Sequence, residues 1–426
     1  MAGISKTAAR EGWRAQRRAK EPLRRQLLAY GGFDFPFMLI VIVLLGIGLV
    51  MMFSAGYVNA LRKYGDAYYF IKRQLGYALG GVALMFVISK INLNMLRRFA
   101  IPGLGLAFLL LVVVLFYHTN LSDATAQEDF KRWIPLPGGM TVQPSEVGKL
   151  ALILFYAYAM EKYQRPHYTK ASEQALLRST EAGRLKAFWH RWRYTGLYMA
   201  VLLLMVALVF LENHVSGTVI TLGIGALMIF VGEQRIPLWF YGLVAVIAVA
   251  AVAVFYTHPE ILPAYAAKRI IAFKDPMLDP TGDNWQITQS LLAIGSGGWF
   301  GLGWGESIQK HLYLPEPQND FVFAIVCEEI GFIGAFAILL LFVALVWRGF
   351  MIALHTKERF GSLLVIGIVL QVGMQTALNI GVVTGVLPNT GIPLPFFSAG
   401  GTALLMLLAE MGIVLAVSRV AREIKR

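Results

Sequence analysis

The chain has 426 residues, of which 57% are hydrophobic and 15% are charged, and its formal net charge is +13. A soluble globular domain carries roughly 25% charged residues, so this composition excludes a soluble or a disordered protein. The single cysteine, Cys327, excludes an intramolecular disulfide and a metal site built from cysteines.

Ten apolar stretches along the chain are candidates for membrane-spanning helices, because a bilayer core requires roughly 20 apolar residues in a helix. The sequence therefore predicts an all-α integral membrane protein with ten transmembrane helices. The second and fourth stretches are short and need flanking residues to complete a crossing. In chain order, the ten stretches cover residues 35–54, 75–89, 100–118, 147–160, 194–211, 216–231, 236–256, 321–347, 361–383 and 399–418.

The distribution of lysine and arginine predicts how these helices are oriented. If the N-terminus is cytoplasmic, most of the 38 basic residues fall in cytoplasmic segments, as the positive-inside rule requires. Both termini are then cytoplasmic, with a basic arm over residues 1–33, a membrane domain over 34–418 and a tail over 419–426. The arm is expected to contact anionic membrane lipids, with docking of a cytoplasmic partner as the alternative. The net charge therefore has an explanation that involves no nucleic acid.

The predicted extracytoplasmic loop between the seventh and eighth helices, residues 257–320, is long for a connection without a domain of its own. Its interleaved aromatic residues, among them Trp299 and Trp304, are typical of a loop packed into the membrane interface rather than of a flexible linker. A glycine-rich stretch over 295–305 offers a phosphate cradle as a further interpretation. That signal is weak, because no Lys-Ser/Thr pair follows it as in a P-loop.

Charged side chains inside the predicted spans are costly and normally face a cavity or a partner. Glu146 and Lys149 lie three residues apart at the start of the fourth span, where they can pair on one helix face. Alternatively, the Glu146 carboxylate only stabilises the N-terminus of the helix, through the helix dipole. Glu328 and Glu329 in the eighth span are either contacts between helices or functional groups, and Glu410 lies in the tenth span.

Asp320 stands just before the eighth span, at its outer mouth. An acid at the boundary between membrane and water has the position that a general base needs. The competing interpretation is an ordinary helix N-cap.

The segment 384–401 is apolar and uncharged but contains three prolines and four glycines. Proline and glycine forbid a continuous helix here. Non-helical backbone at membrane depth is tolerated only where protein buries it or where it lines a cavity. The sequence therefore predicts a re-entrant loop that lines a pocket.

A series of motifs resembles, in order across most of the chain, the SEDS family of shape, elongation, division and sporulation proteins (FtsW, RodA and SpoVE). Only the basic arm and residues 161–193 lie outside the resemblance, which is nearest to the division and sporulation branch. The motifs are Lys131-Arg-Trp-Ile, Gln143-Pro-Ser-Glu-x-x-Lys149, Ala272-Phe-x-Asp-Pro276, Gln286-x-x-Gln-Ser290, Ala293-Ile-Gly-Ser-Gly-Gly298, Gly301-x-Gly, Tyr313-Leu-Pro-Glu316, Asn319-Asp-Phe321, Glu328-Glu-x-Gly331, and Asn379-Ile-Gly through Pro395-Phe-Phe-Ser-Ala-Gly-Gly401.

The resemblance implies a peptidoglycan glycosyltransferase of the bacterial cytoplasmic membrane. It would transfer the growing glycan from its lipid pyrophosphate to the 4-hydroxyl of another lipid II. The family's essential acid falls on Asp320, and its conserved lysine, which lies close to that acid, falls on Lys149. The other candidate substrate-binding residues are Arg269, Glu146, Glu316, Ser398, Gly400 and Gly401.

This chemistry agrees with the residues. A sugar hydroxyl needs a base, which Asp320 can supply. A pyrophosphate leaving group needs cations, which Lys149 and Arg269 can supply, with Mg²⁺ or Mn²⁺ held by carboxylates as a further option. Lys149 beside Asp320 would also keep that acid ionised. The family further implies a class B penicillin-binding transpeptidase and other division proteins as partners.

Two departures from the family pattern concern the surroundings of the site. Ala399 stands where a tyrosine is common, and residues 213–217 replace a turn that often carries an acid. We therefore assign this turn no catalytic role and interpret His214 as a turn or lining residue.

Two other classes of protein compete with an enzyme. A lipid II flippase or related transporter would place charges at the membrane midplane and would show two related halves. The sequence has no internal repeat and its acids cluster on the outer side, which favours the enzyme. A pure scaffold would have no need of Asp320 and Lys149 together.

Overall fold

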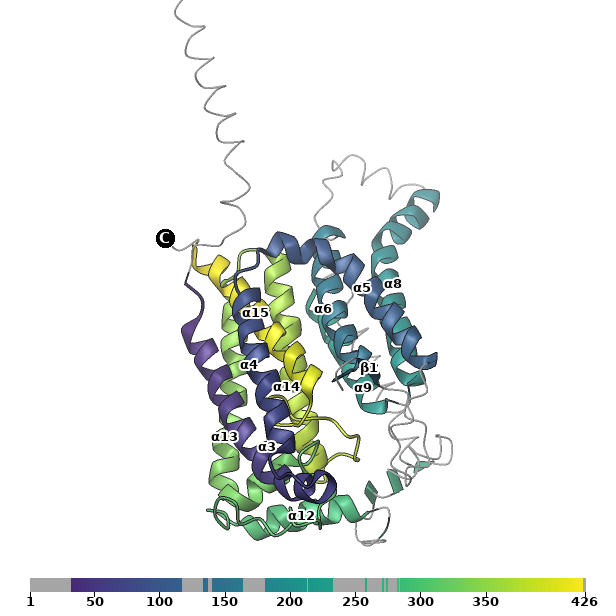
Figure 1. The fold of residues 1–426 in the computed structure, drawn as a ribbon. Coiled ribbons are helices and arrows are strands. Elements are labelled where there is room, and N and C mark those ends of the chain that lie inside the picture. Colours follow the sequence, from purple (N-terminus) through teal and green to yellow (C-terminus); the bar gives the residue numbers. More distant parts are fainter. Residues whose placement is uncertain are drawn as a thin grey trace, which may run out of the picture.

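The computed structural model is almost entirely helical in the part of the chain that it describes, with one small two-stranded sheet (Figure 1). Eight of the described helices are long and apolar enough to cross a membrane, and the chain is a multi-pass membrane protein. The predicted seventh span, most of the N-terminal arm and Arg269 lie outside the described residues. The structure describes residues 32–116, 133–136, 140–163, 181–212, 214–232, 257–258, 270–271, 273–274, 282 and 284–423.

The helices follow the predicted apolar stretches but extend beyond most of them. The second and fourth stretches become helices of 20 residues each, because flanking residues continue them. The fifth belongs to a helix that begins at Glu181, earlier than expected. In chain order the helices are α3 (Phe35–Tyr64), α4 (Tyr69–Ile88), α5 (Leu93–Phe116), α6 (Pro144–Tyr163), α8 (Glu181–Leu211), α9 (Val215–Gly232), α12 (Trp285–Gly297), α13 (Val322–His355), α14 (Arg359–Val383) and α15 (Gly401–Glu423).

Local sequence signals explain where the first of these helices begins and ends. The Asp34 side chain accepts a hydrogen bond from the backbone N–H of Phe37 at 3.1 Å, which satisfies a donor that the first turn leaves free. Pro36 fits the first turn, where its missing N–H costs nothing. Gly65 ends the helix in the left-handed conformation, with φ +69°, and its N–H donates to Leu61.

The helices form two neighbouring groups, α3, α4, α13, α14 and α15 on one side and α5, α6, α8 and α9 on the other (Figure 1). The groups meet where α14 contacts α6 and α9. Both α6 and α14 are therefore central. Because α14 contacts both groups, it is more buried than the preceding helix α13. The outer helices instead expose large apolar side chains such as Leu79 and Leu109, as lipid contact requires.

A short hairpin precedes α6 and was not predicted. Its strands β1 (Ile134–Leu136) and β2 (Met140–Val142) pair antiparallel. The Thr402 hydroxyl donates to the Thr141 carbonyl at 2.8 Å, which attaches the hairpin to the start of α15. The segment that leads into α6 is thereby fixed against the C-terminal helix.

The segment predicted as one long outer loop contains a helix. α12 lies across the ends of the bundle, roughly perpendicular to the long helices (Figure 1). The predicted phosphate cradle after it is wrong, because the N–H groups of Gly301, Leu302 and Gly303 already donate to backbone carbonyls. Those of Leu302 and Gly303 donate to Glu328 and Glu329, at 2.9 and 3.1 Å.

These contacts are explained by a break in α13 at Gly331, whose backbone is non-helical with φ +68°. The break leaves carbonyls free at the end of one half-helix and N–H groups free at the start of the next. Phe332 and Ile333 donate their N–H groups to the carbonyls of Gly298 and Trp299. The glycine-rich stretch therefore satisfies both sides of the break.

Candidate active site

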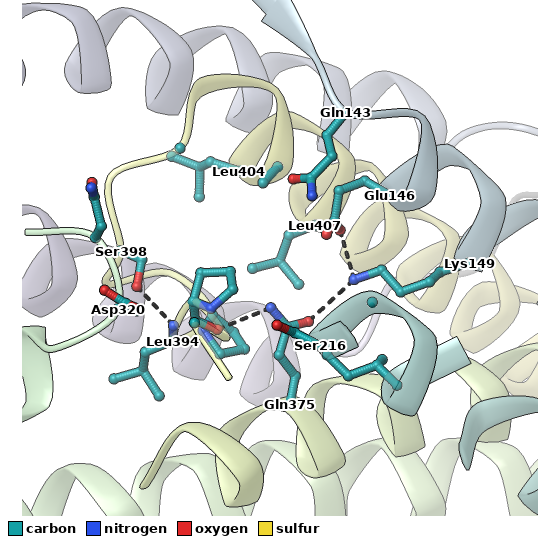
Figure 2. A pocket seen from close by; sticks show the side chains of 18 of the residues that line it. Gln143, Glu146, Lys149, Ser216, Asp320, Gln375, Leu394, Ser398, Leu404 and Leu407 are labelled. Carbon is teal, nitrogen blue, oxygen red and sulfur yellow. Dashed lines mark hydrogen bonds and ion pairs between the residues drawn. The ribbon is translucent and has the colours of Figure 1, made fainter. Parts of the chain in front are cut away.

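A cavity of about 430 Å³ lies among α6, α9, α14, α15 and the segment 384–401 (Figure 2). That segment is non-helical, as predicted, and residues 390–400 supply much of the cavity wall. Among the described residues, the charged side chains that line it are Glu146, Lys149, Asp320 and Glu410. One cavity thus gathers acids and a lysine from two helices, α6 and α15, and from the loop before α13.

Glu146 and Lys149 enter the cavity from the first turns of α6. The predicted pair is confirmed, since the Lys149 ammonium lies 2.8 Å from the Glu146 carboxylate. The Lys149 side chain is only 2% exposed, and a buried ammonium requires such a partner to offset its lost hydration. Gln375 of α14 also accepts from it, at 3.5 Å.

Asp320 lies just outside the N-terminus of α13. The N-cap interpretation is wrong, because Phe321 occupies the N-cap position and α13 begins at Val322. The Asp320 carbonyl accepts a hydrogen bond from the Asn379 side chain at 2.7 Å. Gly391 approaches the acid so closely that an added Cβ would lie 3.4 Å from Asp320 Oδ2.

Lys149 and Asp320 line the same cavity although they are far apart in the sequence. They lie on opposite sides of the view in Figure 2, with Gln375 and Leu394 between them. The described contacts of the Lys149 ammonium are with Glu146 and Gln375. Among the described residues, Lys149 therefore forms its ion pair with Glu146 and not with Asp320.

Two of the other predicted substrate-binding residues line the cavity, namely Ser398 and Gly400. The Ser398 hydroxyl accepts from the backbone N–H of Leu394 at 2.7 Å, which fixes the turn that faces Asp320 (Figure 2).

Two further predicted residues, Gly401 and Glu316, are not among the residues that line the cavity. Gly401 is outside the lining and begins α15 against the ring of Tyr77. Glu316 is also outside it, and its carboxylate forms an ion pair with Lys63 near the surface. Arg269 lies outside the described residues.

Glu328 and Glu329 are buried away from the cavity. The Glu329 carboxylate forms an ion pair with Lys310 at 2.7 Å and accepts from the Ser54 hydroxyl at 2.6 Å. Glu328 accepts from the Ile308 backbone N–H at 2.9 Å. Both carboxylates thus bind the loop that ends at Asp320, which favours the structural interpretation.

Several lining residues were not predicted. Gln371 and Gln375 of α14 line the cavity one helical turn apart, and Asn379 follows after another turn. Polar amides at a spacing of four residues within an apolar span were the signal that could have identified them.

His214 lines the cavity, which confirms its interpretation as a lining residue. Its Nδ1 atom lies 3.3 Å from the Ser145 hydroxyl and 3.4 Å from the Gln143 amide nitrogen. Both neighbours belong to the Gln-Pro-Ser-Glu motif that carries Glu146. His214 therefore supports the loop in front of α6.

Sequence comparisons relate the chain to bacterial cell-wall proteins. Stage V sporulation protein E of Bacillus subtilis (strain 168) is 38% identical over 390 residues, which are 91% of this chain and 98% of that protein. A probable peptidoglycan glycosyltransferase FtsW from Trichlorobacter lovleyi is 36% identical over 387 residues, which are 91% and 93% of the two chains.

Solved structures show the same similarity. A chain from a study of how a peptidoglycan synthase complex coordinates polymerization and crosslinking has a TM-score of 0.69 and 27% identity, covering 91% of this chain and 98% of its own. The rod shape determining protein RodA of Thermus thermophilus has a TM-score of 0.60 and 26% identity, covering 91% and 97%. The sequence model of the FtsW, RodA and SpoVE family, described as cell cycle protein, matches residues 36–423. The chain therefore belongs to the FtsW, RodA and SpoVE family of cell cycle proteins.

Proposed function

We propose that this protein is a peptidoglycan glycosyltransferase that polymerises lipid II at the outer side of the bacterial cytoplasmic membrane. The observation that carries the proposal is the single cavity in which Asp320, Lys149 and Glu146 meet the non-helical segment 384–401. Its volume, about 430 Å³, lies within the usual range for ligand pockets. The name of the relative from Trichlorobacter lovleyi, a probable peptidoglycan glycosyltransferase, supports the same activity.

Asp320 is the proposed general base. It takes the proton of the acceptor sugar's 4-hydroxyl while that oxygen attacks the anomeric carbon of the growing glycan. The glycosidic bond forms as the bond from that carbon to the pyrophosphate oxygen breaks, and the electron pair stays on the pyrophosphate. Lys149 stabilises this developing negative charge, because an ammonium in a water-poor cavity interacts strongly with an anion.

A divalent cation is a separate proposal. No cluster of three or more His, Cys, Asp or Glu side chains suited to a metal ion occurs among the described residues. Polymerisation measured with and without EDTA tests whether Mg²⁺ or Mn²⁺ is needed.

The full topology is also proposed. α6 and the stretch 236–256 would complete ten transmembrane helices, with both termini cytoplasmic. A class B penicillin-binding transpeptidase, alone or with other division proteins, is the proposed partner. A structural relative from a peptidoglycan synthase complex that coordinates polymerization and crosslinking supports this proposal. Lipid II, with its lipid tail in the bilayer, is the proposed substrate.

A lipid II flippase remains the second candidate, because Glu410 carries the polar lining into the middle of α15. A charge at that depth is the feature that a transporter predicts. Movement of fluorescent lipid II across liposomes containing only this protein would support that candidate.

The decisive experiment compares purified wild type with Asp320→Asn, each with its cognate transpeptidase, in polymerisation of lipid II. Wild type should produce long glycan strands and the variant should lose about 10² to 10⁴ of the rate, the usual contribution of a general base. Thr376→Val is the matched control, because it removes a buried hydroxyl of α14 that has no hydrogen-bond partner. Equal activity of Asp320→Asn and wild type would overturn the assigned role.

A further inference from the structure

α14 carries a stripe of three amide side chains, Gln371, Gln375 and Asn379, at a spacing of one helical turn. Residues four apart on a helix lie above one another on the same face. All three are at least nine-tenths buried, although α14 is a membrane-spanning helix in which uncommitted amides would be costly. The bonds of these amides therefore indicate what the stripe does.

Gln375 and Asn379 each form hydrogen bonds with two different parts of the site. Gln375 accepts from the Lys149 ammonium at 3.5 Å and donates to the Pro393 carbonyl at 3.0 Å (Figure 2). Asn379 donates to the Asp320 carbonyl at 2.7 Å and to the Ile392 carbonyl at 2.6 Å. Each amide thus joins one proposed catalytic residue to the segment 384–401, at the consecutive residues Ile392 and Pro393.

Gln371 extends the pattern to Glu410, another charged residue of the cavity. Gln371 donates to both carboxylate oxygens of Glu410, at 3.1 and 3.0 Å. From Gln371 to Asn379, successive turns of α14 therefore contact Glu410, Lys149 and Asp320.

We propose that Gln375 and Asn379 are positioning residues that fix where Lys149 and Asp320 lie relative to each other. Lys149 belongs to α6 and Asp320 to the loop before α13, and the ion pair of Lys149 is with Glu146, so no direct ion pair sets the separation of Lys149 and Asp320. A rigid helix can set it instead, because one turn of α14 has a fixed rise of about 5.4 Å. This inference rests on the proposed glycosyltransferase activity.

Several features distinguish this arrangement from ordinary interhelical contact. The amides reach α6, the loop before α13 and the segment 384–401, so three separate parts of the site share one helix. The Asn379 orientation is fixed, because its NH₂ group meets two carbonyls, which a flipped amide oxygen would oppose. The side-chain oxygen of Asn379 is buried without a hydrogen-bond partner. Asn379 therefore binds the two carbonyls although its own acceptor stays unsatisfied.

The test uses near-isosteric variants that lack the amide, Gln375→Met and Asn379→Leu, in full-length protein with its transpeptidase. Each should lower the kcat of lipid II polymerisation about 10- to 100-fold, because misplacing a catalytic group by about 1 Å can cost 10²-fold. The KM for lipid II should change less than threefold. Thr376→Val, next to Gln375 on the same helix, should leave both constants unchanged.

The double variant separates a shared geometric role from two local ones. Residues that act as a unit have non-additive effects, so the double variant should lose no more than the worse single variant. Folding is checked by the rate at which a thiol reagent reaches the buried Cys327. Unchanged kcat in both single variants, losses that multiply in the double variant, or losses matched by faster Cys327 labelling would each overturn the inference. Failure of wild type to polymerise lipid II would instead overturn the proposed function.

Discussion

The buried ion pair between Lys310 and Glu329 gives a quantitative prediction about the loop that ends at Asp320. Both side chains are 0% exposed, and their charged atoms lie 2.7 Å apart. Lys310→Met would leave the Glu329 carboxylate in the interior with only the Ser54 hydroxyl as a donor. Removing one partner of a buried pair typically costs about 3–5 kcal/mol, because the remaining charge is neither hydrated nor neutralised.

The double variant Lys310→Met, Glu329→Met should be less destabilised than the sum of the two single variants. Replacing a buried ion pair by apolar residues of similar volume is often neutral. Two polar groups would still lose the Lys310 ammonium, namely the Gly305 carbonyl and the Ser54 hydroxyl. Each unsatisfied group costs about 1–3 kcal/mol. Lys310→Met also loses these two bonds and in addition leaves a buried carboxylate, so the double variant should be no less stable than Lys310→Met.

Cys327 supplies the assay, because it is the only cysteine and lies buried next to Glu328 in the same half of α13. Its reaction with a thiol reagent requires local opening, so the labelling rate follows the opening equilibrium when closing is fast. A loss of about 3–5 kcal/mol corresponds to labelling that is roughly 10² to 10⁴ times faster. Cys327→Ala measures the background. The reasoning is refuted if the costs of the single variants simply add in the double variant.

Three further predictions use the same labelling assay or the polymerisation assay. Gly331→Ala should destabilise α13 by several kcal/mol. Backbone strain at φ +68° should cost about 1–3 kcal/mol, and the overlap of the added Cβ with the backbone of Gly301 should cost more. Gly46→Ala, with open space around its Cβ, should instead stabilise by about 0.5–1 kcal/mol, and equal effects would contradict the argument. Asp34→Asn removes the ion pair with Arg348 and should cost less than about 1 kcal/mol of stability, because the Arg348 side chain is 37% exposed. Asp34→Ala also removes the helix cap and should cost about 1 kcal/mol more. Asp34→Ala matching Asp34→Asn in stability would exclude a role for the cap. Polymerisation should be unchanged in both Asp34 variants, because Asp34 is not among the residues that line the cavity.

Much of the candidate site follows from the sequence. Glu146 and Lys149 pair as their spacing on one helix face predicts, and the segment 384–401 lines a cavity as its prolines and glycines predict. Asp320 was also placed correctly outside α13, although its alternative as an N-cap was wrong. These features depend on neighbours within a few residues, which a single sequence displays.

Other features depend on contacts between distant segments. The break at Gly331 exists because residues 298–303 supply its hydrogen bonds, and the helix α12 that precedes them carried no apolar stretch long enough to be noticed. The roles of Glu328 and Glu329 stayed open until the structure placed Lys310, Ser54 and Ser307 against them. The same holds for Gln371, Gln375 and Asn379 on α14, because their role follows from hydrogen bonds to residues on other segments.

The sequence by itself determined the membrane helices and the types of charged group in the site, because hydrophobic length and helical periodicity are local properties of the chain. Only the tertiary structure decided how Lys149 and Asp320 are arranged, since one belongs to α6 and the other to the loop before α13, and they face one cavity from opposite sides. Their relation is set by the packing of α6, α13 and α14 and by side-chain bonds to Gln375 and Asn379. These bonds join residues 226 and 59 positions apart in the chain, and no local pattern specifies them.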